Sequence, residues 1–254
     1  ISIKIPKNMI TPFLAVLIGT AVLLLLGAGV NANINLKNTN AENDTPWIII
    51  TSSWGFAVFV GAYIASSYSG AHLNPAVSIG LAVADKFSWD LVPIYILAQL
   101  IGAMLGSFLS YLIYIDHYKI TKNEEAVKGT FFTSPAIRNF KNNFFSEFMG
   151  TFMLVFGIFF IASPMINIEG VVTENYGIGS LESLPVGILV WVIGMSLGGT
   201  TGYAINPVRD LGPRIIYQLI PRKNKKPDWE YSWIPIFGPI TGAISAGLLF
   251  SILV

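Results

Sequence analysis

Charged residues divide this chain into six long apolar segments. Six windows contain no Asp, Glu, Lys or Arg, and each ends at a charged residue or at the end of the chain: 8–36, 45–84, 91–115, 148–168, 183–208 and 231–254. About 20 apolar residues in a helix cross the hydrocarbon core of a bilayer, so each window can hold one crossing. The pattern predicts an all-α membrane protein with six transmembrane helices.

The small share of charged residues argues against a soluble protein. Only 11% of the 254 residues are charged, whereas soluble domains carry about 25%. The first window is too long for a signal peptide and no clear cleavage site follows it. The chain has no Cys, which excludes disulfides and thiolate metal sites. A net charge of +1 gives no indication of nucleic-acid binding.

One motif occurs twice at matching places in the chain. The second window contains "SGAHLNPAVSIG" near its end, at 69–80, and "TGYAINPVRDLG" stands 132 residues later; both contain N-P-x-x-x-x-G with a Gly four residues before the Asn. Asn-Pro alone often only starts a turn. Two copies in two matching halves instead favour an internal repeat of the kind found in transport proteins.

Other windows repeat at a similar offset. Gly19-Thr20 corresponds to Gly150-Thr151, and Gly102-Ala103 corresponds to Gly242-Ala243. We therefore expect one transmembrane channel domain over residues 1–254, with a first repeat at about 8–115 and a second at about 144–254. Each repeat holds three crossings, so the two halves must be inverted in the bilayer.

The two Asn-Pro pairs predict two short helices that enter the membrane partway. Pro fits the first turn of a helix, where an N–H would lack a partner, and Asn before it can cap that helix. Pro75 and Pro207 are thus expected to begin re-entrant half-helices, with non-helical backbone before them at 70–73 and 202–205. Such backbone exists at membrane depth only where protein buries it or where it lines a wet cavity. The sequence therefore predicts a pore.

These motifs resemble the major intrinsic protein family, the aquaporins and glycerol facilitators, over essentially the whole chain. The resemblance rests on the motifs "SGAHLNPAVSIG" and "GYAINPVRDLGP". Asp210 after Arg209 and the segment "GTFFTSPAIRNF" at 129–140 are similar to the glycerol-conducting branch in particular. The resemblance implies an aquaporin-like fold and a polyol pore.

The resemblance also implies the centre of the pore. There Asn74 and Asn206 would donate hydrogen bonds to a passing solute, and the half-helix N-termini would oppose cations and protons. The remaining motif residues are Pro75, Ala76, Pro207 and Val208. A ladder of carbonyl acceptors would come from Gly70, Ala71, His72, Leu73, Gly202, Ala204 and Ile205.

The resemblance maps a selectivity filter onto four residues: Trp54, Gly194, Tyr203 and Arg209. Trp54 lies 20 residues before Asn74, and Gly194 and Tyr203 lie 12 and three residues before Asn206. Water-selective members of the family have His where this chain has Gly194. Glycine is expected to leave room for a carbon backbone, and the Arg209 guanidinium to donate to hydroxyls and repel cations.

Each filter residue also has a structural interpretation. Trp54 could be an interfacial belt residue, Gly194 a helix-packing glycine, and Tyr203 a cap on the mouth. Arg209 is harder to explain in this way, because an intramembrane charge is costly and usually functional. His72 is expected to orient a loop carbonyl rather than to bind a solute or a metal.

Two further residues, Glu147 and Asp210, are expected to support the pore structurally. Glu147 resembles the buried carboxylate of the family, which accepts hydrogen bonds from backbone donors of a broken loop, and Asp210 is assigned a structural role. The position in the first half that matches Glu147 is Val16, where the family usually has Glu. We expect water or another side chain to substitute for that carboxylate.

The expected function is passive diffusion of glycerol and similar small uncharged solutes, with water, while ions and protons are excluded. Alternatives are a water channel, a facilitator of protonated lactic acid and, from another class, a secondary active transporter. The chain is not expected to be an enzyme or to use a cofactor or metal. A homotetramer in the lipid bilayer of the cell membrane is implied by the resemblance. Gly194→His is expected to reduce glycerol flux far more than water flux.

Overall fold

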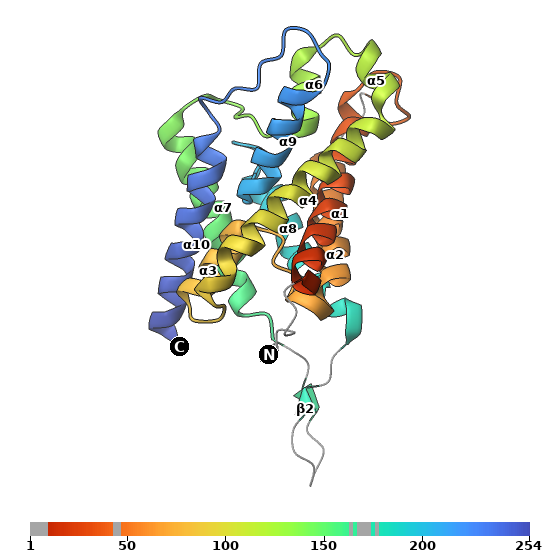
Figure 1. The fold of residues 1–254 in the computed structure, drawn as a ribbon. Helices are drawn as coiled ribbons and strands as arrows, with labels where there is room; N and C mark the ends of the chain where they lie inside the picture. The colour runs from red at the N-terminus through yellow and green to blue at the C-terminus, as the bar shows by residue number, and fades with distance from the viewer. Residues whose placement is uncertain (1–9, 43–46, 163–164, 167–173, 176–177) are drawn as a thin grey trace.

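Six long helices stand side by side as a bundle in the computed structural model (Figure 1). The structure describes residues 10–42, 47–162, 165–166, 174–175 and 178–254. The long helices are α1 (Ile10–Asn35), α2 (Trp47–Ser69), α4 (Val92–Ile113), α7 (Phe140–Phe159), α8 (Leu184–Leu197) and α10 (Trp233–Leu253). The connections contain η1 (Trp89–Leu91), α5 (Ile115–Ile120), α6 (Glu124–Phe131), η2 (Gly179–Ser183) and the paired strands β1 (Met165–Ile166) and β2 (Glu174–Asn175).

Two half-helices complete the predicted fold: α3 (Pro75–Val83) and α9 (Pro207–Leu219). Both begin at the expected prolines, and the Asn74 and Asn206 side chains cap them. The non-helical backbone before each of them is also observed, at 70–73 and 202–205. The prediction of six spanning helices with two re-entrant half-helices is confirmed.

The fourth span differs from its sequence window. α7 begins at Phe140 rather than Phe148, so Glu147 lies inside the helix instead of at its edge. Among the described residues, five helices are long and apolar enough to cross a membrane by composition, and α7 is not one of them. Its first two turns are polar because they contain Lys141, Asn142, Asn143 and Glu147. The last part of the predicted window, 163–168, lies largely outside the described residues.

Helix packing follows the two-repeat pattern. α1 packs on α4 and α2, while α7 packs on α10 and α8 in the same way. Each half-helix contacts the last helix of the opposite half as well as its own, α3 on α10 and α9 on α4. A Cβ at Gly102 would meet the Leu17 carbonyl of α1, and one at Gly242 would meet the Phe148 carbonyl of α7, so both glycines permit close helix approach. This pairing favours the interpretation as an inverted repeat.

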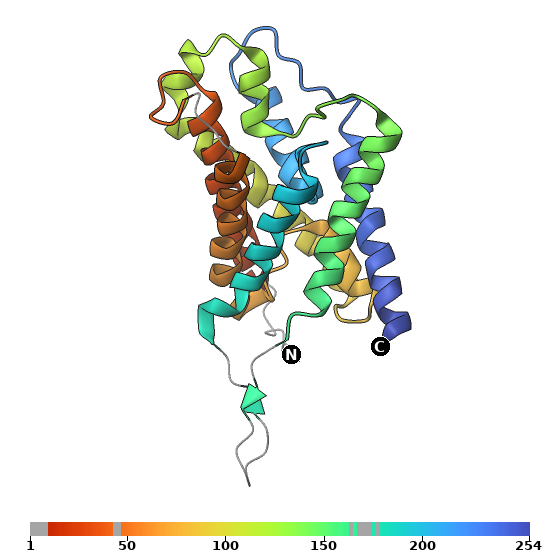
Figure 2. The same ribbon diagram turned by 180° about the vertical axis from the view of Figure 1, so that it is seen from behind.

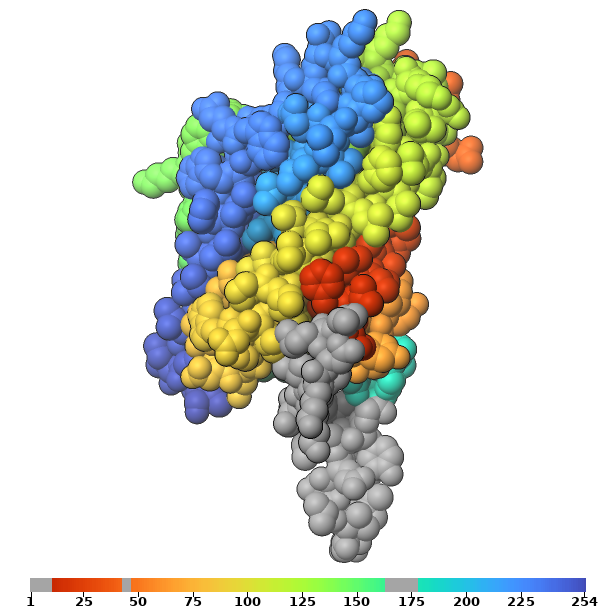
Figure 3. All heavy atoms as spheres, viewed as in Figure 1, coloured from red at the N-terminus to blue at the C-terminus, as the bar shows by residue number. Residues whose placement is uncertain are grey.

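The half-helices occupy opposite halves of the bundle. α3 lies in the lower half in Figure 1 and α9 in the upper half, and the reverse view in Figure 2 agrees. α1 begins and α10 ends at the lower end, as an even number of crossings requires. α4 crosses obliquely between α10 and α1 on the face that Figure 3 shows. This leaves the interior of the bundle to the loops that precede the half-helices.

The outer surface is apolar where a membrane would contact it. Large hydrophobic side chains are exposed on α1, α2, α4, α8 and α10, for example Leu14, Phe56, Phe108, Val192 and Leu248. The chain is a multi-pass integral membrane protein.

Candidate pore and selectivity filter

The two Asn-Pro segments are hydrogen-bonded to each other at the centre of the bundle. Asn74 Nδ2 donates to the Ile205 carbonyl at 2.7 Å, and Asn206 Nδ2 donates to the Leu73 carbonyl at 3.0 Å. Each Oδ1 caps its own half-helix, accepting from Ala76 N in one case and from Val208 N and Arg209 N in the other. An amide nitrogen carries two hydrogens, so each Asn retains one donor for a solute.

The loops before the half-helices adopt unusual backbone conformations. Ala71 has a φ of 58°, Tyr203 of 39° and Ile205 of 42°, in the left-handed region that non-glycine residues rarely occupy. Such conformations persist only where the surroundings determine them. The side chains behind each loop therefore decide whether the pore keeps its shape.

Glu147 holds the second loop. Its Oε1 accepts from Thr201 Oγ1 at 2.6 Å and from Ala204 N at 2.9 Å, and its Oε2 accepts from Ile205 N at 2.9 Å. The side chain is buried. One carboxylate thus satisfies two backbone donors that a helix or sheet would otherwise pair, in agreement with the structural role predicted for Glu147.

The first loop is held differently, because Val16 is buried where a carboxylate would stand. Gln99 Nε2 donates to the His72 carbonyl at 2.5 Å and to Ser78 Oγ at 3.1 Å. Tyr95 OH donates to the Ser69 carbonyl at 3.0 Å. Other side chains therefore hold this loop, but they donate to its carbonyls rather than accept from its N–H groups.

His72 lines the cavity, and its ring also packs against two aromatic side chains. Its ring packs edge-on against Phe87 and Tyr95, with ring centroids 4.5 and 5.6 Å away. Its carbonyl is the one that Gln99 holds. The ring itself makes no hydrogen bond to a carbonyl among the described residues, since its buried Nδ1 has no partner there, so the expected orienting role of the His72 side chain stays a prediction.

Three of the four residues predicted to form the filter line the same cavity. Trp54, Tyr203 and Arg209 all line it. The Arg209 guanidinium carbon lies 4.1 Å from the centroid of the Trp54 ring, and its Nη1 donates to the Phe131 carbonyl at 3.3 Å. A cation over an aromatic face is attracted by the ring. The remaining guanidinium N–H groups can donate to a solute.

Trp54 faces the interior, so the alternative of a membrane-belt residue does not hold. Its exposed fraction is 5%, and its indole N–H donates to Asn31 Oδ1 at 3.3 Å. A Cβ at Gly27 would collide with the ring, which shows how closely α1 covers it. Asn31 in turn donates to the Gly129 carbonyl, in the segment that the sequence linked to the glycerol-conducting branch.

Gly194 differs from its expected role. It does not line the cavity, because the Tyr203 ring occupies the space beside it: a Cβ at Gly194 would lie 2.6 Å from Tyr203 Cζ. The room that glycine was expected to leave for a solute is therefore taken by an aromatic side chain. Any residue at 194 other than glycine must displace Tyr203, so Gly194→His would change packing as well as chemistry.

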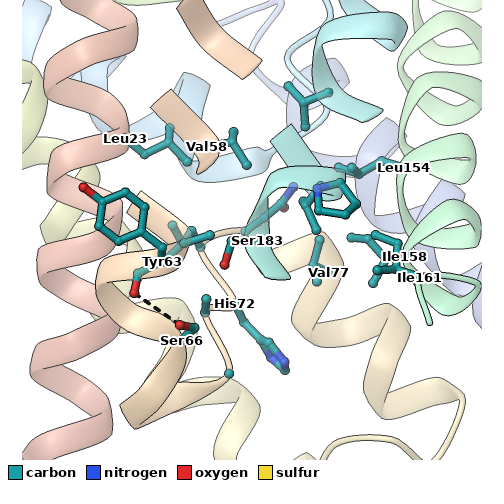
Figure 4. Close-up of a pocket in the computed structure, with 18 of the residues that line it drawn as sticks. Leu23, Val58, Tyr63, Ser66, His72, Val77, Leu154, Ile158, Ile161 and Ser183 are labelled. Carbon is teal, nitrogen blue, oxygen red and sulfur yellow. Dashed lines mark hydrogen bonds between the residues drawn. The ribbon is translucent and has the colours of Figure 1, made fainter. Parts of the chain in front are cut away.

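The cavity has a volume of about 640 Å³, and its lining includes both Asn residues and four serines: Ser66, Ser67, Ser180 and Ser183. Figure 4 shows Tyr63, Ser66 and Ser183 among the residues that line it. Aliphatic side chains form much of the lining, among them Leu23, Val58, Val77, Leu81, Leu154, Ile158 and Val190.

The loops before the two half-helices also contribute to the lining. The proposed ladder residues all line the cavity except Gly202, which faces Thr133. Three ladder carbonyls already accept a protein donor, those of His72, Leu73 and Ile205. A carbonyl oxygen has two lone pairs, so each can accept a second hydrogen bond. The other motif residues, Pro75, Ala76, Pro207 and Val208, are buried.

Asp210 is buried and fastens the loop 129–140 to α9. It accepts from Thr133 N at 2.9 Å and Thr133 Oγ1 at 2.7 Å, and Arg214 Nε donates to it at 2.8 Å. Arg214 also lies over the Phe132 ring and donates to the Asp228 carbonyl. Because Phe131 ends α6 only two residues before Thr133, the Asp210 contacts also fix the carbonyl to which Arg209 donates.

Sequence reasoning missed several residues that build the site: Asn31, Trp47, Tyr95, Gln99, Thr133 and Arg214. The signal for Arg214 was available, since it stands four residues after Asp210 on the same helix face. Polar residues within apolar windows, such as Asn31 and Gln99, were a weaker signal of the same kind.

Outside the spans, Arg138 binds the loop between α9 and α10. Its Nη1 and Nη2 donate to the two Asp228 carboxylate oxygens at 2.8 and 3.0 Å. These hydrogen bonds hold the pKa of Asp228 below its usual value. The Arg138–Asp228 pair also supports α9, because Arg214 of α9 donates to the backbone carbonyl of the same Asp228.

The sequence as a whole matches the family model described as major intrinsic protein over residues 4–250. The chain is 47% identical to "Glycerol uptake facilitator protein 3" of Lactiplantibacillus plantarum, with 93% of this chain and 94% of that relative covered. It is 44% identical to "Probable glycerol uptake facilitator protein" of Thermotoga maritima, with 94% and 97% covered. The X-ray structure of the aquaglyceroporin from Plasmodium falciparum superposes with a TM-score of 0.80 at 32% identity, covering 96% of each chain. Together with the inverted half-helices and the paired Asn residues, these matches identify the chain as a member of the major intrinsic protein family.

Proposed function

We propose that this protein is a passive channel for glycerol and similar small uncharged solutes, with water as a co-permeant. The arrangement at the predicted filter carries the proposal: Arg209 stacks on Trp54 beside Tyr203, and neither His of the chain lies there. A guanidinium donates to hydroxyl oxygens while aromatic faces accommodate the carbon backbone. The names of the two relatives, both glycerol uptake facilitators, support the same solute class.

The lining explains why the solute should be uncharged. The lining combines carbonyl acceptors and the Asn donors with many aliphatic side chains. The N-termini of α3 and α9 point at the centre, each with about half a positive charge, and Arg209 adds a full one. Cations are repelled by this field, and anions find no compensation for lost water along the aliphatic part of the lining.

The proposal extends to assembly and location. The channel would act as a homotetramer with one pore per subunit, in the lipid bilayer of the cell membrane, and without catalysing a reaction. The support is the family membership and the apolar outer surface, which lipid and neighbouring subunits can cover.

Stopped-flow light scattering on proteoliposomes tests the function. Vesicles are exposed to an impermeant osmolyte in one experiment and to glycerol in another. They should shrink in both, and fast re-swelling is expected only in glycerol. Rates should not depend on imposed proton or sodium gradients. A gradient-dependent rate would instead indicate a secondary transporter.

Two valines of α8 provide a matched pair of variants. Val190 is buried and lines the cavity, whereas Val192 is exposed on the outer face of the same helix. Val190→Trp is expected to abolish both water and glycerol flux, and Val192→Trp to leave both unchanged. Equal effects of the two substitutions would contradict a pore at this cavity.

A water channel is the second candidate, because the Tyr203 ring fills the space beside Gly194 and narrows the filter. Rapid shrinkage without re-swelling in glycerol would favour it. Protonated lactic acid is tested in the same vesicles by following internal acidification at mildly acidic pH.

A further inference from the structure

Gly194 of α8 and Gly198, which directly follows the end of that helix, leave the space in which the Tyr203 ring lies. A Cβ at Gly194 would lie 2.6 Å from Tyr203 Cζ, and a Cβ at Gly198 would lie 2.6 Å from Tyr203 Cδ1. The two positions are one helical turn apart and therefore share a face. The ring is thus held in direct contact with the helix backbone.

Trp47, the first residue of α2, covers the same arrangement from a second side. Its ring meets the Tyr203 ring edge-on, with centroids 5.9 Å apart and an interplanar angle of 75°. Its indole N–H donates to the Gly194 carbonyl at 2.9 Å. A Cβ at Gly198 would also lie 2.9 Å from Trp47 Cζ2, so Trp47 and Tyr203 share one surface on α8.

Packing, not hydrogen bonding, fixes the Tyr203 side chain. Its hydroxyl is buried and has no hydrogen-bond partner among the described residues. Its backbone is in the left-handed region, with a φ of 39°, so the chain itself does not favour this position. Gly194 and Gly198 form one side of the ring's site and Trp47 another. Trp47 itself does not line the cavity.

We propose that Trp47 is a specificity-determining positioning residue of the filter, which acts by holding the Tyr203 ring against Gly194 and Gly198. The inference rests on the proposed function, since it concerns which solutes pass the same filter. With Trp47 in place, the Tyr203 ring is held in one position, and the opening of the filter therefore keeps one width. Without it, the ring can move away from Arg209 and admit a larger solute.

The test measures the upper size limit of the pore in proteoliposomes, with water, glycerol and the five-carbon polyol xylitol as solutes. Trp47→Ala is expected to raise the xylitol-to-water permeability ratio about fivefold, because contacting residues couple by amounts of this order. Trp47→Phe retains an aromatic edge but loses the indole N–H, and its ratio should rise less. Trp229→Ala is the matched control, because Trp229 is exposed to a similar degree and has no ring contact with Tyr203. A role of Trp47 only as a membrane anchor would leave the ratio unchanged in all three variants and overturn the inference.

A double-mutant cycle shows whether Trp47 acts through Tyr203. In a Tyr203→Ala background, Trp47→Ala should change the ratio no further; an additional, independent increase would overturn the proposed route. If Trp47→Ala fails to fold, Trp47→Phe alone decides, and an unchanged xylitol ratio then contradicts the inference. Failure of the proposed function gives a different result: wild-type vesicles that conduct water but no glycerol.

Discussion

The two re-entrant loops have the same backbone design but are held by opposite chemistry. Behind the second loop, one carboxylate, Glu147, accepts hydrogen bonds from Thr201, Ala204 and Ile205. Behind the first loop, two neutral groups, Gln99 and Tyr95, donate to loop carbonyls. Both loops nevertheless contain a non-glycine residue in the left-handed region and end in a capped half-helix.

The two re-entrant loops differ in the strength of the interactions that hold them. Hydrogen bonds to an ionised group are roughly twice as strong as neutral ones. On the second side, Asp210 with Arg214 and Asp228 with Arg138 add two further ion pairs. On the first side, His72 Nδ1 and Gln99 Oε1 are buried and have no partner among the described residues. We infer that charge holds the second loop, while shape and aromatic packing hold the first.

Removal of the carboxylate should have the largest effect. Glu147→Leu leaves three buried donors without an acceptor, and we expect a loss of about 3–5 kcal/mol in the free energy of unfolding. Glycerol permeability per folded protein should fall more than tenfold, because a factor of ten corresponds to only about 1.4 kcal/mol. Chemical denaturation in detergent and stopped-flow assays measure the two quantities.

Glu147→Gln is the matched control for this prediction. It retains one acceptor oxygen of similar shape, so its effects should lie between those of wild type and Glu147→Leu. A well-folded, conducting Glu147→Leu protein would show that the second loop does not depend on its carboxylate.

The corresponding change in the first loop should cost less. Gln99→Leu removes the donors to the His72 carbonyl and to Ser78 Oγ, but it also removes an unpartnered buried oxygen. We expect a loss of about 1–3 kcal/mol in unfolding free energy, with a moderate loss of glycerol flux. If Gln99→Leu proved as damaging as Glu147→Leu in the same assays, the contrast between charged and neutral support would be wrong.

Much of this fold could be predicted because the sequence repeats itself. The charge-free windows and the two Asn-Pro pairs determine the six spans, both half-helices and their caps, since each follows from local chemistry and from the low tolerance of lipid for unpaired backbone groups. The start of α7 was placed too late, because polar residues such as Asn143 and Glu147 do not interrupt a helix that other helices cover.

The filter was harder to predict. The family resemblance maps Trp54, Tyr203 and Arg209 to the predicted filter, but no local pattern indicates that Tyr203 turns onto Gly194 or that Trp47 covers it. These contacts join residues about 150 positions apart, from Trp47 to Gly194 and Tyr203. The substitutes for a carboxylate at Val16 were likewise invisible, since Gln99 and Tyr95 belong to a different helix and reach the loop only after α4 has packed.

A smaller effect is expected from the second neutral support of the first loop. Tyr95→Phe deletes only the hydroxyl that donates to the Ser69 carbonyl and keeps the ring contacts with His72 and Phe87. The loss should be about 1 kcal/mol in unfolding free energy. Tyr95→Leu, which also removes the ring, is the informative comparison. If it were no worse than Tyr95→Phe, aromatic packing would not contribute to holding this loop.

The smallest effect concerns pH and the charged side alone. Arg138 holds the pKa of Asp228 below its usual value, so the folded state favours the carboxylate. The stabilisation is fully present above the ordinary Asp pKa of about 4 and is lost as the pH falls through the lowered folded-state value. Because Arg138 is half-exposed, its size should be at most about 1 kcal/mol.

Asp228→Asn tests the origin of this acid sensitivity. Unfolding free energies of wild type and variant, measured from pH 6 down to about pH 3, should converge as the carboxylate is protonated. The pair fastens the segment that Arg214 contacts, so hydrogen exchange at 227–229 should rise in wild type as the pH falls and should be raised already at pH 6 in Asp228→Asn. Equal acid sensitivity of wild type and Asp228→Asn would contradict the assignment of this pH dependence to the Arg138–Asp228 pair.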